Sequence, residues 1–223
     1  TLSPSSAASD VYKRQDLIFI SEAIKLNDWK FWVITGIDYS GKTTILRYIA
    51  KQGVPSLHWS DLRTVPWIRP VLERPYDIVF EMGDMSRASF ILLVASTMFE
   101  IMKKRKIVLV DSYWYRFYVK EKIFGQSSLE ILETLFKLPK PVKVFYIDIT
   151  PEEAYQRSGG KFTKYESFNK TKEGFIKFQK ILDKELRKLL EDLDLDIVYL
   201  DGEKEISVNA KIKLKIIKNE TAR

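Results

Sequence analysis

Residues 36–44 read Gly36-Ile37-Asp38-Tyr39-Ser40-Gly41-Lys42-Thr43-Thr44. They match the pattern G-x-x-x-x-G-K-[ST], in which backbone N–H groups cradle phosphates, a lysine reaches the β- and γ-phosphates, and a threonine hydroxyl binds Mg²⁺. An apolar run over 31–34 predicts a buried strand before the loop. Apolar residues at helical spacing over 44–50 predict a helix after it. Because strand, loop and helix follow in the required order, the sequence predicts a phosphate-binding loop.

Strand and helix patterns alternate along the rest of the chain. We expect further strands at 53–59, 107–111, 142–148 and 196–201, and helices at 86–103, 127–138, 165–193 and, broken or short, 208–217. This alternation predicts an α/β fold, a phosphate-loop three-layer sandwich whose five-stranded parallel sheet is covered by helices on both faces. Ligands of such sheets lie outside the carboxyl ends of the strands, where the loop and Asp111 fall.

The helical patterns also predict which residues face the core. In 127–138 the expected inward residues are Ile131, Leu132, Leu135 and Phe136. In 165–193 they are Phe175, Phe178, Leu182, Leu186, Leu189 and Leu193.

Composition excludes several classes of chemistry. The 223 residues hold no cysteine, which excludes disulfides, thiol catalysis and cysteine-based zinc sites. The one histidine, His58, follows a short apolar stretch, and we interpret it as structural. The apolar run at 88–99 is about a dozen residues long and is interpreted as a buried helix rather than a membrane span. We expect a cytoplasmic protein with no membrane partner.

Residues 1–15 differ from the remainder. They include a small, polar stretch without periodicity, which we interpret as a disordered or non-native leader, and we treat 16–223 as one domain.

The net charge of +7 concentrates between Arg157 and Lys188. A basic face suits polyphosphates and could suit nucleic acid, but a solvated helix face explains the same pattern. We favour the solvated face and regard a nucleic-acid partner as unexpected.

Three clusters are candidates for chemistry. Asp111 ends an apolar strand, where a carboxylate either shares Mg²⁺ with Thr43 or caps the next helix. Residues 153–162 pair Arg157 with two glycines and Lys161, as in a hinged basic lid or an ordinary helix end. The aromatic run 113–118, with Arg116, either stacks a base and grips a phosphate or belongs to the core.

Taken in order, these segments resemble the thymidylate kinase family of nucleoside monophosphate kinases. Gly36-x-Asp38-x-x-Gly41-Lys42-Thr43-Thr44 is similar to that family's loop, including the aspartate at its third place. Asp111-Ser112-Tyr113 stands where the family has Asp-Arg-Tyr, and Pro151-Glu152-Glu153-Ala154 through Arg157 resembles its approach to a lid.

The resemblance implies a kinase domain with a lid at about 156–166, ATP as phosphoryl donor, and Mg²⁺ held by Thr43 and Asp111. It implies that loop residues 36 and 38–44 (Gly36, Asp38, Tyr39, Ser40, Gly41, Lys42, Thr43, Thr44) bind ATP. Asp38 would also lie beside the acceptor nucleotide. Lys42, Asp38, Arg157 and Lys161 are the expected catalytic residues. Family members are often dimers, so a homodimer is a further expectation.

The acceptor side departs from the family pattern. Ser112 replaces the arginine of Asp-Arg-Tyr, Met98 or a neighbour replaces another, and 59–63 replaces a Glu-Pro-Gly-Gly stretch. We therefore nominate Arg87 and Arg116, with Tyr113, for the acceptor site. The expected reaction is dTMP to dTDP; a deoxynucleoside or other small-molecule kinase and a nonenzymatic nucleotide-binding module remain alternatives. A GTPase is disfavoured, since Asn169-Lys170-Thr171-Lys172 lacks the required acid.

Overall fold

The computed structural model describes residues 29–72, 82–125 and 128–221, and the expected leader at 1–15 lies outside these ranges. Five strands form one parallel sheet in the order β2-β3-β1-β4-β5. Their bounds are β1 Trp32–Thr35, β2 Ser56–Leu57, β3 Leu109–Asp111, β4 Lys143–Asp148 and β5 Ile197–Asp201. The expected five-stranded parallel sheet is thus confirmed.

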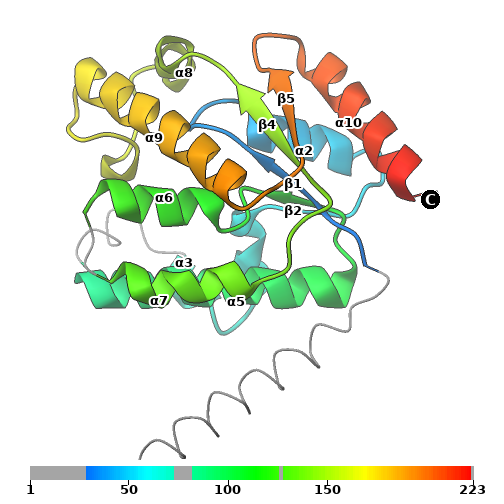
Figure 1. Ribbon diagram of the computed structural model, residues 1–223, viewed down its shortest axis with the longest axis horizontal. Helices are drawn as coiled ribbons and strands as arrows, with labels where there is room; N and C mark the ends of the chain where they lie inside the picture. The colour runs from blue at the N-terminus through cyan, green and yellow to red at the C-terminus, as the bar shows by residue number, and fades with distance from the viewer. Residues whose placement is uncertain (1–28, 73–81, 126–127, 222–223) are drawn as a thin grey trace, which may run out of the picture.

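Helices connect the strands and cover the sheet (Figure 1). The α-helices are α2 Lys42–Ala50, α3 Arg69–Leu72, α5 Asp84–Arg105, α6 Tyr115–Ile123, α7 Leu129–Glu133, α8 Pro151–Ser158, α9 Lys172–Asp192 and α10 Ile206–Thr221. The 3₁₀ helices of the described residues are η1 Trp59–Thr64, η2 Thr134–Lys137 and η3 Lys164–Glu166.

The two faces of the sheet carry separate cores, because successive side chains of a strand point to opposite faces. On one face Trp32, Ile34 and Phe145 pack with residues of α2 and α10. On the other face Val33, Val110 and Val144 pack with residues of α5, α6, α7 and α9. Figure 1 shows α2 and α10 on one side of the sheet and α5, α6, α7 and α9 on the other. The expected three-layer α/β sandwich is confirmed.

Helix α6 was not predicted, and β2 and β3 are shorter than expected by two residues or more. Helix α6 falls in the aromatic run after β3, and its N-cap residue Trp114 makes no side-chain cap, so the usual start signal is missing. Strand β2 covers only Ser56–Leu57 of the expected 53–59, because Gly53 turns with φ 85° and Pro55 has no N–H to donate. Strand β3 begins at Leu109 rather than at residue 107.

Helix boundaries and faces also need correction. The expected helix at 127–138 divides into α7 and η2, and Phe136, predicted to face inward, is an exposed side chain. The helix expected over 165–193 begins at Lys172, where the Thr171 hydroxyl caps it by accepting from Gly174 N–H. On that helix Leu190 is fully buried, whereas Leu189 and Leu193 are half-buried. The final helix, α10, is longer than predicted and unbroken.

Helix α5 extends well beyond the apolar run seen in the sequence. By length and composition it could cross a membrane, and no other helix of the described residues could. Its buried residues, which include Ala88, Ile91, Val94 and Met98, lie in the main core, and the helix packs against α7 and η1. We therefore interpret α5 as a core helix, as expected from its sequence.

Helix α10 carries a lysine, Lys213, whose side chain is buried against the sheet. The Lys213 side chain is fully buried, its amine has no hydrogen-bond partner among the described residues, and it lies 5.7 Å from the centre of the Phe145 ring. Burial lowers the pKa of Lys213 well below its ordinary value.

Replacing this amine should stabilise the fold. Because the folded pKa of Lys213 lies below the unfolded one, the unfolded chain binds a proton that the native state lacks, and the free energy of unfolding rises with pH. We expect Lys213→Met to unfold at higher urea than the wild type at pH 7. The difference should shrink by up to about 1.4 kcal/mol for each pH unit towards pH 10.

The exposed Lys215 on the same helix provides the control, since Lys215→Met should change stability little at any pH. A Lys213→Met protein that is less stable than the wild type, or whose advantage does not depend on pH, would contradict this account of the buried amine.

Candidate functional site

The phosphate-binding loop joins β1 to α2 at the carboxyl edge of the sheet. Gly36 begins it with φ 140°, and a Cβ on this residue would lie 2.6 Å from the carbonyl oxygen of Ile147 in β4. Only glycine therefore allows the loop to leave β1 so close to its neighbour. The loop ends at Gly41, the N-cap of α2, so the helix presents its positive dipole end to the site.

Lys42 is buried and folds back over its own loop. Its Nζ donates to the carbonyl oxygen of Ile37 and to Ser40 Oγ at 3.0 Å. Burial, together with the nearby Arg116 cation, lowers the pKa of Lys42 to about 7. A phosphate anion would favour the charged amine, so this lysine is suited to an anionic ligand.

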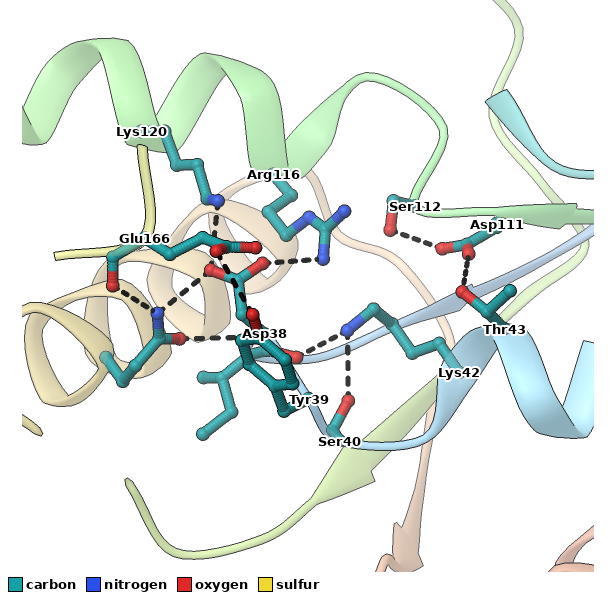
Figure 2. Close-up of polar contacts among 12 residues, drawn as sticks. Asp38, Tyr39, Ser40, Lys42, Thr43, Asp111, Ser112, Arg116, Lys120 and Glu166 are labelled. Atoms are coloured by element: carbon teal, nitrogen blue, oxygen red, sulfur yellow. Dashed lines mark hydrogen bonds and ion pairs between the residues drawn. The ribbon is translucent and has the colours of Figure 1, made fainter. Parts of the chain in front are cut away.

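Asp38 is the most heavily bonded loop residue (Figure 2). Its carboxylate accepts from Arg116 Nη1 at 3.0 Å, Lys120 Nζ at 2.9 Å and Gln179 Nε2 at 2.9 Å. We call Asp38, Arg116, Lys120 and Gln179 the Asp38 cluster. Burial alone would raise the pKa of Asp38, but Lys120, Arg116 and Lys42 hold it well below its ordinary value.

Two helices supply the partners of Asp38. Arg116 and Lys120 are four residues apart on α6 and so lie on the same side of that helix. Gln179 comes from α9, where it interrupts the apolar stripe and is fully buried. Burial lowers the pKa of Lys120, and the Asp38 carboxylate opposes that change. The cluster therefore fastens α6 and α9 to the phosphate-binding loop.

Asp111 lies beside the start of α2. Its carboxylate accepts from Thr43 Oγ1 at 3.0 Å and from Ser112 Oγ at 2.5 Å, and His58 Nε2 lies 3.3 Å away (Figure 2 shows the first two contacts). Burial would raise the pKa of Asp111, but Arg116, Lys42 and His58 lower it. The residue ends β3, and α6 begins only at Tyr115, so the alternative reading of Asp111 as a helix cap is wrong.

Thr43 and Asp111 fit a nucleotide-borne Mg²⁺ ion. Mg²⁺ keeps several waters and is usually bound through one or two carboxylates together with substrate phosphates, rather than in a cage of protein ligands. Among the described residues no group of three or more His, Cys, Asp or Glu side chains could hold a metal.

Arg157 lies over the loop from α8. Its Nε donates to Glu153 Oε1 at 2.8 Å and its Nη2 to the carbonyl oxygen of Gly202 at 3.0 Å. A Cβ on Gly41 would be 3.9 Å from Arg157 Nη1, so the guanidinium lies next to the phosphate-binding loop. Gly159, with φ 57°, then ends α8 and turns the chain into the expected lid segment.

A cavity of about 790 Å³ is lined by the phosphate-binding loop, Arg116, Lys120 and Arg157, and its volume is typical of a small-molecule site. Its lining runs from the β5–α10 turn, across the loop, to α6 and the lid segment. At one end are Arg157, Gly202, Lys204, Glu205, Ile206 and Asn209. At the other are Asp38, His58, Trp59, Arg116, Phe117, Lys120, Thr163, Tyr165 and Glu166.

Five nominated residues lie outside the lining of this cavity: Gly36 and Asp111, which border it, and Arg87, Tyr113 and Lys161. Tyr113 is a core side chain that donates to the carbonyl oxygen of Pro139 at 3.3 Å. Arg87 is buried and donates to Glu121 at 2.8 Å. Lys161 is exposed, and only its carbonyl meets the loop, by accepting from Tyr39 Oη. We therefore withdraw Tyr113 and Arg87 from the acceptor site. Arg116 does line the cavity.

Sequence reasoning missed several lining or bonded residues. Lys120 would have been found as the helical neighbour of Arg116 if α6 had been recognised. Gln179 was detectable as a polar residue inside the apolar stripe of α9. His58 was interpreted as structural, and it does cap η1, but it also lines the cavity beside Asp111.

Comparison with known sequences identifies distant relatives. No family model matches the chain. The thymidylate kinases of Thermoanaerobacter sp. (strain X514) and of Caldanaerobacter subterraneus subsp. tengcongensis are each 28% identical to it, over 217 and 212 residues. The alignments cover 85% and 84% of this chain and 97% and 94% of the relatives. The chain is therefore similar to thymidylate kinases along most of its length, at a low level of identity.

Solved structures show the same fold. Deoxyadenosine kinase from M. mycoides with bound dATP gives a TM-score of 0.58 at 15% identity, covering 84% of this chain and 98% of that one. Thymidylate kinase from Candida albicans gives 0.62 at 18% identity, covering 88% and 94%. These likenesses place the chain in the phosphate-loop α/β fold.

The Asp38 cluster yields a stability prediction. Removing one partner of a buried ion pair leaves the other charge uncompensated, at a cost of about 3–5 kcal/mol. We expect Asp38→Asn to lower the free energy of unfolding by about this amount. Adding Lys120→Met to that variant should recover at least half of the loss, measured by urea unfolding. Strictly additive losses in the double variant would show that the two charges are not coupled.

Proposed function

We propose that the protein is an ATP-dependent nucleotide kinase that phosphorylates a deoxynucleoside monophosphate, with dTMP as the first candidate. One observation carries the proposal: the phosphate-binding loop and the Arg116–Lys120 cation pair line the same cavity, with Asp38 between them. The thymidylate kinases related to the chain support the same reaction class.

The loop end of the cavity is the proposed donor site. Loop amides, Lys42 and the start of α2 would bind the phosphates of ATP, with the nucleoside towards Gly202–Asn209. Thr43 and Asp111 would hold the accompanying Mg²⁺, which neutralises charge on the β- and γ-phosphates. The proposed use of ATP implies a cytoplasmic location, where ATP is abundant.

The α6 end is the proposed acceptor site, and its chemistry favours a monophosphate over a hydroxyl. A hydroxyl acceptor must lose a proton, which calls for a nearby base. The Asp38 carboxylate already accepts from two cations and an amide, and its lowered pKa makes it a weak base. A phosphate monoester is largely dianionic at pH 7 and needs no base, while Arg116 and Lys120 provide charge to bind it.

In the proposed reaction an oxygen of the acceptor phosphate attacks the γ-phosphorus, the bond to the β-phosphate oxygen breaks, and ADP leaves. Charge on the transferring group would be stabilised by Lys42 and Arg157. Glu153 and the carbonyl oxygen of Gly202 hold the Arg157 guanidinium in place. The lid segment, residues 156–166, would exclude water from the γ-phosphate, and Lys161 would join the lid's positive charge.

A coupled ADP-release assay with Mg-ATP tests the proposal against a panel of deoxynucleoside monophosphates and nucleosides. We expect a monophosphate, dTMP first, to stimulate ADP release. We expect Lys42→Ala to reduce the rate by about 10²–10³-fold or more. Stimulation by nucleosides alone would replace the proposal with a deoxynucleoside kinase. ATP binding without any acceptor response would indicate a nonenzymatic nucleotide-binding module.

Arg116→Met tests the acceptor site separately. Loss of a charged hydrogen bond to the acceptor phosphate should raise the KM for the monophosphate by about tenfold or more, with a much smaller change in the KM for ATP. Lys122→Met is the control, because Lys122 lies on the same helix but is exposed and paired with Glu185. An equal rise of both KM values in Arg116→Met would contradict the assignment.

A further inference from the structure

Gln179 is a buried side chain whose hydrogen bonds join two parts of the site. It is fully buried on α9, and its amide makes three hydrogen bonds. Its Oε1 accepts from the backbone N–H of Asp38 at 3.0 Å, and its Nε2 donates to the Asp38 carboxylate at 2.9 Å. The same Nε2 donates to the carbonyl oxygen of Glu166, the last residue of η3, at 2.9 Å.

The orientation of this amide is fixed by chemistry. A backbone N–H can only donate, and a backbone carbonyl can only accept, so Oε1 must face Asp38 N and Nε2 must face Glu166 O. One side chain therefore joins the loop aspartate to the lid segment.

A second connection runs parallel to the first. Tyr39 follows Asp38 in the loop, with φ 60°, and its Oη donates to the carbonyl oxygen of Lys161 at 2.5 Å. Figure 2 shows its ring beside the Glu166 side chain, whose Oε2 lies 3.3 Å from Tyr39 Oη. Glu166 Oε2 also accepts from Thr163 N at 2.7 Å, which closes η3 on itself. The lid segment is thus connected to Asp38 through Gln179 and to Tyr39 directly.

We propose that Gln179 is a positioning residue that aligns Asp38 with the acceptor and, together with Tyr39, holds the lid segment closed against the phosphate-binding loop before substrates bind. Gln179 contacts no reacting atom and acts through Asp38. A lid that is closed in advance spares the substrate part of the cost of ordering it. The kinetic part of this inference rests on the proposed kinase function; the structural part does not.

Gln179→Met is the main test, because methionine keeps the volume of glutamine and removes all three hydrogen bonds. We expect amide hydrogen exchange in 159–167 to accelerate by at least about tenfold, because the lid segment loses one of its two hydrogen-bonded connections to the phosphate-binding loop. We expect the KM for the monophosphate to rise by about tenfold and the KM for ATP to change little. Loss of folded protein alone would lower the apparent kcat and leave both KM values unchanged.

Two further variants complete the design. Leu182→Val removes packing one turn along α9 without touching a hydrogen bond, so lid exchange should match the wild type. Tyr39→Phe removes only the hydroxyl that binds the lid, so exchange in 159–167 should accelerate even if Gln179→Met does not fold. Unchanged lid exchange in Gln179→Met or in Tyr39→Phe would overturn the proposal, whether or not the wild type phosphorylates an acceptor. Absence of acceptor turnover in the wild type would instead overturn the proposed function, and hydrogen exchange would still decide the role of Gln179.

Discussion

A buried negative charge must be fully paired, and the rest of the site is organised around how this chain pairs Asp38. Its carboxylate is satisfied by Arg116 and Lys120 from α6 and by Gln179 from α9. Each partner comes from a different part of the sequence than the loop, so the loop, both helices and the lid segment are held in one arrangement. Loss of Asp38 would leave two cations facing each other in the protein interior.

In the proposed reaction, the same arrangement would separate a donor end of the cavity from an acceptor end. On the α2 side, Lys42, Thr43 and the loop amides would bind phosphates and their Mg²⁺ ion, while Arg157 lies beside Gly41. On the α6 side, Arg116 and Lys120 flank the Asp38 carboxylate, and the Glu166 carboxylate also lines this side.

The sequence predicted the parts of this structure that depend on local patterns. Gly36–Thr44 and the flanking apolar runs were enough to place β1, the loop and α2, and strand–helix alternation was enough for the sheet. It did not predict α6, because an aromatic run without a capping side chain hides the start of the helix. Without α6, the pairing of Lys120 with Asp38 could not be foreseen. The inward orientation predicted for Phe136 was wrong for a similar reason, because a helical pattern in the sequence does not show that α7 ends and the 3₁₀ helix η2 begins at Thr134.

The central claim is that one cavity binds a donor nucleotide and an acceptor monophosphate on either side of Asp38. Isothermal titration with P1,P5-(adenosine, thymidine) pentaphosphate, which joins both nucleotides through their phosphates, tests it most directly when compared with ADP in the presence of Mg²⁺. The account predicts one molecule bound per chain, at least about 100-fold more tightly than ADP, equivalent to about 2.7 kcal/mol. An affinity equal to that of ADP would contradict the claim, because the thymidine monophosphate half would then have no site.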